Sequence, residues 1–315
     1  MQAANTGYIF PGQGSQKVGM LSELATAFPQ VKDTFSEASD VLGYDLWDLI
    51  QHGPETELAK THIQQPAIVT ASIAIWRLWV EKGGQPPVIA AGHSLGEYSA
   101  LTAAGVMAFT DAVALVQKRG QYMQTAVPMG EGGMAAIVGL EDDKIIAACE
   151  AARQGEEVAA VNFNSPGQVV ISGHTAAVNR AAELCKAAGA KRALPLPVSA
   201  PFHSILMKPA ADSFANDLAA VTLSAPAFPV LQNYGLDTPN DPDAIRSNLI
   251  SQIYNPVPWV GTINRFSEAD VTQVVEIGPG KVLSGLNKRI NADMMAISVN
   301  DPANLNDALA ALEAA

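Results

Sequence analysis

The pentapeptide Gly92-His93-Ser94-Leu95-Gly96 places a serine between two glycines in the pattern G-x-S-x-G. The apolar run Val88–Ala91 precedes it and predicts a buried parallel strand, and a helix is expected from about Gly96. A sharp turn from strand to helix exposes the serine hydroxyl, and the flanking glycines remove Cβ atoms that would clash there. We therefore predict that Ser94 is a nucleophile. A serine in a glycine-rich turn, or a helix cap, is the alternative.

A serine at its ordinary pKa is a weak nucleophile and needs a base within hydrogen-bond reach. Of the five histidines, His203 is the best candidate, because it follows a predicted strand at the point where the chain re-enters the larger part of the fold. Its position alone supports a role as the base and a structural role equally. The other histidines are weaker candidates. His52 and His62 lie in polar connecting segments, the side chain of His93 is expected to project away from Ser94, and His174 is expected to cap a helix.

Arg119 falls on the apolar face of a helix that we expect to start at Asp111, with Thr110 or Asp111 as its cap. A planar guanidinium matches a carboxylate with two parallel hydrogen bonds, and Gly120 would leave room for close approach. A substrate carboxylate, a structural ion pair and a side chain that reaches the surface all remain open as explanations.

Two other patterns are too incomplete to indicate a site. His93 and Glu97 are four residues apart, but the H-E-x-x-H zinc pattern is absent, so we expect no metal. The loop Gly12-Gln13-Gly14-Ser15 lacks the lysine of a P-loop and the spacing of a dinucleotide-binding loop. We therefore expect no nucleotide-binding fold.

These residues lie in a chain whose strands and helices alternate, which predicts an α/β fold. We expect residues 1–127 and 200–315 to form one large α/β unit, with strands at 6–10, 88–91, 228–232 and 271–277. Helices are expected at 20–42, 66–81, 210–220, 242–253 and after Gly278-Pro279-Gly280.

Residues 128–199 have a different rhythm and are predicted to form an inserted subdomain. Strands at 134–140, 158–163, 168–172 and 192–198 and helices at 142–153 and 175–188 follow the order βαββαβ. That order is typical of the ferredoxin-like split βαβ unit.

The chain of 315 residues carries 19 Lys+Arg and 31 Asp+Glu, a net charge of −12, so nucleic acid is an unfavourable partner. The start lacks the pattern of a signal peptide, and the apolar stretches are too short or too interrupted to span a membrane. Cys149 and Cys185 fit a reducing cytoplasm, where both are expected to be small buried hydrophobes. We predict a cytoplasmic protein without a membrane segment.

Taken together, the motifs of this chain identify a family by their order: Phe10-Pro11-Gly12-Gln13-Gly14-Ser15-Gln16, Gln65-Pro66-Ala67, Gly92-His93-Ser94-Leu95-Gly96-Glu97-Tyr98, Arg119-Gly120, Asn162-Phe163-Asn164-Ser165-Pro166-Gly167-Gln168, Pro201-Phe202-His203-Ser204 and Glu276-Ile277-Gly278-Pro279-Gly280. Over nearly its whole length the chain resembles the malonyl-CoA:acyl carrier protein transacylases of fatty acid synthesis and the related acyltransferase domains of polyketide synthases. Each motif alone is common, but the combination is specific.

The resemblance implies a hydrolase-like core with a mainly parallel sheet, a ferredoxin-like subdomain, and a role for each matching residue. Ser94 would carry the acyl group and His203 would be its base. The backbone N–H groups of Gln13 and Leu95 would form the oxyanion hole, and a backbone carbonyl at Gln252 would orient the histidine. The remaining expected roles are malonyl carboxylate binding (Arg119) and pantetheine contacts (Asn162, Asn164).

The reaction so implied moves malonyl from malonyl-CoA, through a malonyl-serine, to the phosphopantetheine thiol of an acyl carrier protein, without metal or redox cofactor. The enzyme is expected to act as a monomer. Because such carrier proteins are acidic, Lys191 and Arg192 are the predicted docking residues, with Lys186, Lys281, Lys288 and Arg289 as further cations. A polyketide-pathway transferase, a serine thioesterase or hydrolase, and a non-catalytic carrier-binding module are the alternatives.

Overall fold

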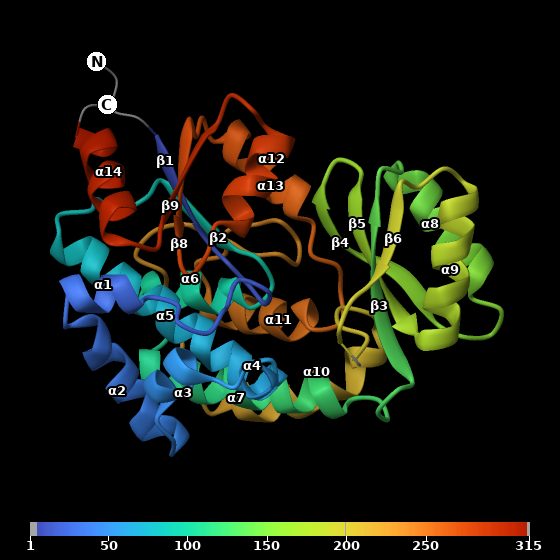
Figure 1. The fold of residues 1–315 in the computed structure, drawn as a ribbon, viewed down its shortest axis with the longest axis horizontal. Helices are drawn as coiled ribbons and strands as arrows, with labels where there is room; N and C mark the ends of the chain where they lie inside the picture. The colour runs from blue at the N-terminus through green and yellow to red at the C-terminus, as the bar shows by residue number, and fades with distance from the viewer. Residues whose placement is uncertain (1–4, 199, 314–315) are drawn as a thin grey trace.

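The computed structural model describes residues 5–198 and 200–313, which form a mixed α/β structure with two separate sheets. Figure 1 shows the parallel sheet in the left half of the molecule and the antiparallel sheet in the right half. This confirms the predicted fold class, a mainly parallel sheet combined with a smaller α+β unit.

The parallel sheet has five strands in the order β7-β2-β1-β8-β9. Their bounds are β1 (Thr6–Phe10), β2 (Ile89–Gly92), β7 (Val230–Leu231), β8 (Gln273–Ile277) and β9 (Met295–Val299). In β1 and β2, Phe10 is aligned with Gly92, so both strands end at the same edge of the sheet. Ligand sites in such sheets lie beyond the carboxyl ends of the strands, where loops diverge.

Helices cover both faces of the parallel sheet. The helices of this half of the molecule, some against the sheet and others packed on those helices, are α1 (Ser22–Ala27), α2 (Val31–Leu42), α3 (Leu46–His52), α4 (Glu55–Leu58), α5 (Thr61–Glu81), α6 (Gly96–Ala103), α7 (Phe109–Thr125), α10 (Lys208–Ala219), α11 (Pro242–Gln252), α12 (Trp259–Glu268), α13 (Val282–Ile290) and α14 (Pro302–Glu313). Tyr8 and Phe10 of β1 pack into the core that contains α5, whereas Ile9 between them packs with α12 and α13. This alternation is the two-residue period of a strand that is buried on both faces.

The antiparallel sheet has the strand order β4-β5-β3-β6 and carries two helices on one face (Figure 1). Its elements are β3 (Gly132–Val138), α8 (Asp142–Ala152), β4 (Val158–Ser165), β5 (Gln168–His174), α9 (Thr175–Ala187) and β6 (Arg192–Pro195). Element order and strand order are those of a ferredoxin-like unit.

Backbone hydrogen bonds join this unit to the large half of the molecule. The Val257 N–H donates to the carbonyl of Val161 at 2.7 Å, and the Phe163 N–H donates to the carbonyl of Val257 at 3.0 Å. In addition, Met134, Val161 and Val170 belong to the hydrophobic cluster of the large half. Because these contacts join the two parts, the division into a subdomain of residues 128–199 and a larger unit stays a prediction.

Several expected element limits were wrong for local reasons. The helix expected over 20–42 is interrupted at Pro29, which is unfavourable for a helical conformation at Phe28. Helix α5 starts at Thr61 and contains Pro66, because burial of most of its length outweighs the lost hydrogen bond. Helices α3 and α12 and strand β9 were not predicted.

Candidate active site

Strand β2 ends at Gly92 and α6 begins at Gly96, so the predicted sharp turn around Ser94 is present. Ser94 has a positive φ of 50°, in the left-handed region that favours glycine. A Cβ atom on Gly92 would lie 1.9 Å from the carbonyl carbon of Gly96, and one on Gly96 would lie 2.0 Å from the Phe10 oxygen. Both glycines are required by close backbone contacts, as the sequence indicated.

Ser94 and His203 form a hydrogen bond in which the serine Oγ donates to the histidine Nε2 at 2.7 Å. His203 Nδ1 donates to the backbone carbonyl of Gln252 at 2.9 Å, which leaves the Nε2 lone pair facing the serine. His203 also has a positive φ, 62°. Burial and the nearby charge of Arg119 lower the pKa of His203 to about 3, so the ring is neutral and can accept a proton at neutral pH.

Arg119 is fully buried next to this pair. Its guanidinium donates to the side-chain oxygens of Gln65 and Gln252, both at 3.0 Å, and to Ser94 Oγ at 3.3 Å. None of the carboxylates in residues 5–198 and 200–313 forms an ion pair with it, and its Nε has no hydrogen-bond acceptor. Burial lowers the pKa of Arg119. Because Arg119 is buried and forms no ion pair among the described residues, its side chain neither reaches the surface nor belongs to a structural ion pair.

The apolar helix face around Arg119 is present as expected, but two local predictions were wrong. Helix α7 starts at Phe109 after Ala108, without a side-chain cap from Thr110 or Asp111. Gly120 does not open space beside the guanidinium. A Cβ atom there would lie 2.7 Å from the His62 Cα, so this glycine allows α7 and α5 to pack closely.

Gln252 contacts Ser94, His203 and Arg119 through different atoms. Its backbone oxygen accepts from His203, its side-chain oxygen accepts from Arg119, and its Nε2 donates to the Ser94 carbonyl at 2.9 Å. Because Gln252 is the last residue of α11, this helix holds the base, the cation and the nucleophile in one arrangement.

The loop after β1 lies directly against the Ser94 turn. A Cβ atom on Gly12 would be 2.4 Å from the His93 carbonyl oxygen, so only glycine fits there. Within the described part of the chain, the backbone N–H groups of Gln13 and Leu95 donate to no other residue. The Gln13 side chain accepts from Gln65 Nε2 at 3.1 Å, which connects this loop to Arg119 through one further glutamine.

The structure places the two predicted pantetheine residues on β4. Asn164 Oδ1 accepts from His93 Nε2 at 2.8 Å, whereas Asn162 Oδ1 is buried without a partner among the described residues. His93 is therefore tied to the small sheet, with its ring centroid 5.5 Å from that of Trp259. Burial lowers the pKa of His93, which keeps it neutral.

The remaining candidates lie outside this cluster. Lys191 and Arg192 are exposed, and neither forms an ion pair within residues 5–198 and 200–313, whereas Lys186 pairs with Glu183 at 2.7 Å. His174 does not cap α9 with its side chain. Its Nδ1 accepts from the Glu157 backbone N–H instead, and His62 lies in α5 and not in a connecting segment.

Sequence reasoning missed a buried polar group beneath the Ser94 turn. Glu97 accepts from the Asn233 backbone N–H at 2.7 Å and from Gln232 Nε2 at 3.0 Å. Burial raises the pKa of Glu97 to about 7. An acidic residue in the first turn of a helix that contains no other charged residue was the available signal.

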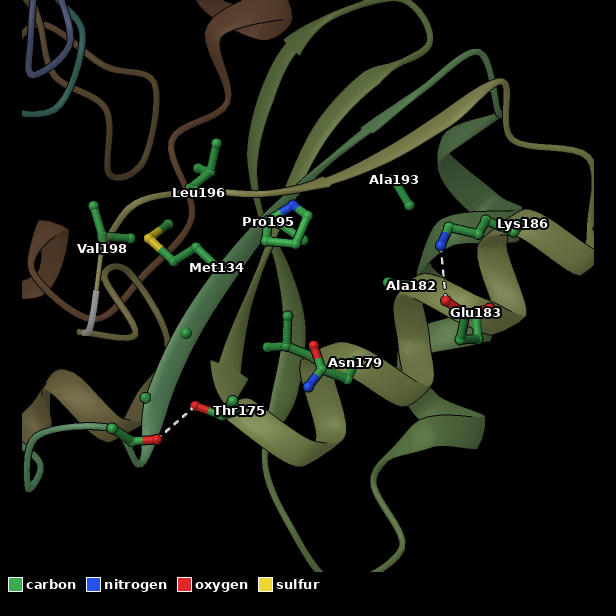
Figure 2. A pocket seen from close by; sticks show the side chains of 15 residues that line it. Met134, Thr175, Asn179, Ala182, Glu183, Lys186, Ala193, Pro195, Leu196 and Val198 are labelled. Atoms are coloured by element: carbon green, nitrogen blue, oxygen red, sulfur yellow. Dashed lines mark hydrogen bonds and ion pairs between the residues drawn. The ribbon is translucent and has the colours of Figure 1, made fainter.

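A separate pocket of about 410 Å³ lies between α9 and the β3–β6 edge of the small sheet (Figure 2). Met134, Leu196 and Val198 line one end, and Asn179 and the Lys186–Glu183 pair lie toward the other. Ser94, His203 and Arg119 do not line it.

Residues 5–198 and 200–313 contain no group of three or more His, Cys, Asp or Glu side chains that could hold a metal ion. Among the same residues, no helix combines the length and apolar character needed to cross a membrane. Cys149 and Cys185 are free and buried, and burial raises the pKa of Cys149 to about 12.

The fold and this buried serine–histidine–arginine cluster agree with the result of a family comparison, in which residues 7–291 match the acyl transferase domain. The chain belongs to this family and is an acyltransferase.

Two curated relatives share a single description. The chain is 57% identical over 302 residues to the malonyl CoA-acyl carrier protein transacylase of Salmonella typhimurium strain LT2, covering 96% of this chain and 98% of the relative. It is 45% identical to the Bacillus subtilis protein of that description, covering 97% of this chain and 96% of the relative.

Two solved structures give the same result. An acyl carrier protein S-malonyltransferase from Vibrio cholerae superimposes with a TM-score of 0.95 at 54% identity, covering 97% of this chain and all of that one (100%). A malonyl-transacylase in complex with a type II polyketide synthase acyl carrier protein superimposes with a TM-score of 0.96 at 55% identity, covering 99% and 100%.

Proposed function

We propose that this acyltransferase moves the malonyl group from malonyl-CoA to the phosphopantetheine thiol of an acyl carrier protein, through a malonyl ester on Ser94. The observation that carries the proposal is a nucleophile bonded to a neutral base at 2.7 Å, beside a fully buried arginine that lacks a carboxylate partner among the described residues. Such an arginine suits an acyl group that ends in a free carboxylate.

In the first half-reaction, His203 Nε2 takes the Ser94 proton as Oγ attacks the thioester carbonyl. The carbonyl of Gln252 holds the charged ring in the same orientation through Nδ1. The backbone N–H groups of Gln13 and Leu95 are assigned to the oxyanion, since neither donates to another described residue. When the tetrahedral intermediate collapses, the C–S bond breaks and His203 returns the proton to the CoA thiolate.

The second half-reaction reverses this sequence with a different thiol. His203 takes the proton of the carrier protein's phosphopantetheine thiol, and the sulfur attacks the ester carbonyl of malonyl-Ser94. The C–O bond then breaks, and the proton moves from His203 to Ser94 Oγ. These steps balance without a metal or redox group, so we assign the enzyme no cofactor.

Arg119 is the proposed selector of the acyl group. Its donors are hydrogen-bonded to the neutral oxygens of Gln65, Gln252 and Ser94, and no carboxylate among the described residues lies within ion-pair distance, although Glu97 interacts with it electrostatically. A malonyl carboxylate supplies the missing charge, whereas an acetyl group cannot. Charge-assisted pairs of this kind are about twice as strong as neutral hydrogen bonds.

We assign the acyl carrier protein to the exposed cations Lys191 and Arg192 of the small unit, and pantetheine to the neighbourhood of Asn162 and Asn164. The net charge of −12 makes a local basic patch necessary for an acidic partner. Residues 128–199 would form the domain that carries this surface. We further propose that the enzyme acts as a cytoplasmic monomer.

Fatty acid synthesis is the pathway we favour, because the curated relatives are named malonyl CoA-acyl carrier protein transacylase, the family of fatty acid synthesis that the sequence resembles. A polyketide pathway is the second candidate, because one relative of 55% identity is bound to a type II polyketide synthase carrier protein. Kinetics with both kinds of carrier protein decide between them, since the cognate protein should show the lower Michaelis constant.

Mass spectrometry of the intact protein and of its peptides tests the proposed chemistry. Incubation with malonyl-CoA should add one malonyl group on a peptide containing Ser94, and Ser94→Ala should remove the signal. Addition of carrier protein thiol should discharge the ester, while a control without thiol should retain it. Modification of another peptide would contradict the assignment of Ser94, and equal loss without thiol would make the protein a hydrolase.

A further inference from the structure

Asn233 is a buried residue just beyond β7 whose side chain holds the backbone on both sides of His93. Its Oδ1 accepts from the Ser94 backbone N–H at 2.8 Å, and its Nδ2 donates to the Gly92 carbonyl at 2.7 Å. One amide group therefore binds the residue before and the residue after the centre of this turn.

The turn needs such support because its backbone is strained. Ser94 has a φ of 50°, which lies in the left-handed region where a residue with a Cβ atom is strained. The His93 N–H donates to the Phe10 carbonyl at 3.0 Å, which fixes the centre of the turn but not the Ser94 N–H. Among the described residues, the Asn233 amide is the partner of that Ser94 N–H.

Asn233 is itself held in place by a hydrogen bond to Glu97. Its backbone N–H donates to Glu97 Oε2 at 2.7 Å, and Glu97 Oε1 accepts from Gln232 Nε2 at 3.0 Å. Glu97 lies in the first turn of α6, which starts just after Ser94. The turn, α6 and the end of β7 thus form a closed ring of hydrogen bonds through one carboxylate and one amide.

We propose that Asn233 is a positioning residue that holds Ser94 Oγ in line with His203 Nε2, through the backbone and without contact with substrate. This inference rests on the proposed role of Ser94 as nucleophile. It predicts that loss of the Asn233 amide slows reactions at Ser94 more than it weakens substrate binding or the fold.

The test compares Asn233→Ala with the matched control Asn248→Ala. Asn248 Nδ2 donates to Gln232 Oε1 at 3.0 Å, so the control removes an amide from the same network without touching the Ser94 turn. A fluorophosphonate probe, which reacts with activated serines whatever their natural substrate, reports on Ser94 alone. Malonylation of Ser94 is followed in parallel by mass spectrometry.

Asn233→Ala removes two hydrogen bonds to the backbone. In this variant the probe should label Ser94 roughly 10- to 100-fold more slowly at saturation, and the probe concentration that gives half of the maximal rate should be unchanged. Asn248→Ala should stay within about twofold of the wild type. Labelling of Asn233→Ala within about threefold of the wild type overturns the proposal. So does an equal loss in both variants, because it would indicate a general packing effect.

Asn233→Asp keeps the proposal testable if the alanine variant does not fold. The carboxylate introduced by this substitution still accepts from Ser94 when ionised but repels the Gly92 carbonyl, whereas its protonated form donates to that carbonyl. At pH 8, where an aspartate at its ordinary pKa is ionised, labelling should therefore be slower than in the wild type at saturating probe, with the half-saturating concentration unchanged. Labelling of this variant at the wild-type rate would overturn the proposed role of the Gly92 contact.

The probe separates this proposal from the function. If the wild type reacts with the probe at Ser94 but takes no malonyl group, the proposed function fails while the Asn233 comparison still stands. If malonylation occurs and Asn233→Ala matches the wild type in both assays, the function stands and the positioning role fails.

Discussion

The carboxyl end of the parallel sheet and the pocket of the antiparallel sheet both contain polar side chains, but they hold them differently. Ser94, His203 and Arg119 are buried and bonded to one another or to Gln252. In the pocket, Asn179 is exposed and Lys186 pairs with Glu183 in solvent (Figure 2).

The difference teaches that chemistry here depends on fixed polar contacts and not on available space. Interactions within a buried network are stronger than in water, and each group is held by several partners. The pocket of about 410 Å³ offers room, but Asn179, Glu183 and Lys186 are exposed there, and solvent weakens their polar contacts.

The largest expected effect comes from removing the reacting pair. Ser94→Ala should abolish the acyl-enzyme, and His203→Ala should slow acylation by about two to four orders of magnitude, as loss of a general base does. Quench-flow measurement of malonyl-enzyme formation checks both. His174→Ala is the matched control, and a comparable loss there would mean that the base has been misassigned.

A second effect concerns pH, because His203 has a pKa of about 3 while its ordinary value is 6.5. A neutral base stays active until pH approaches its pKa, so acylation should not fall through a histidine step between pH 8 and 5. An unshifted histidine would lose roughly 30-fold by pH 5. Stopped-flow acylation across this range provides the measurement.

Glu97 also titrates in this range, with a pKa of about 7, so the profile is repeated with Glu97→Gln. A step near pH 7 that this variant removes belongs to Glu97. A step near the ordinary histidine pKa that persists in it belongs to His203 and contradicts the neutral, buried base.

Charge reversal on the small unit should have a smaller effect and act on one substrate only. Replacing Lys191 and Arg192 by Glu should raise the Michaelis constant for carrier protein roughly 3- to 30-fold, because exposed charges act mainly on encounter. The constant for malonyl-CoA should not change. Equal increases for both substrates would place the patch on CoA, and raising the ionic strength should reduce the difference.

The smallest effect is expected in the pocket. Asn179→Ala should leave malonyl transfer unchanged and shift the free energy of unfolding by no more than about 0.5 kcal/mol, as for an exposed surface residue. Steady-state kinetics and thermal melting check it. A marked loss of transfer would show that the pocket takes part in the reaction and would remove the contrast between the two regions.

Sequence reasoning could reach residues whose motif carries its own geometry. Ser94 follows from glycines on both sides of a strand-to-helix turn, and the small unit follows from its βαββαβ rhythm. Local pattern could not give contacts between distant segments, such as Asn233 with Ser94 or Gln65 with Arg119. Pro29 interrupts a predicted helix, whereas Pro66 lies inside α5. The two prolines differ because α5 is buried along most of its length, and helix propensity does not reveal that burial.

The most direct test of malonyl selection is the ratio of kcat/KM for malonyl-CoA to that for acetyl-CoA, measured for the wild type and for Arg119→Gln. A desolvated charge-assisted pair contributes about 2–5 kcal/mol, so the ratio should fall by roughly 30-fold or more, chiefly through loss of malonyl transfer. Acetyl transfer should persist or rise, because a buried charge without a carboxylate partner is gone. A ratio within about threefold of the wild type would contradict the account, since a surface ion pair alone contributes that much.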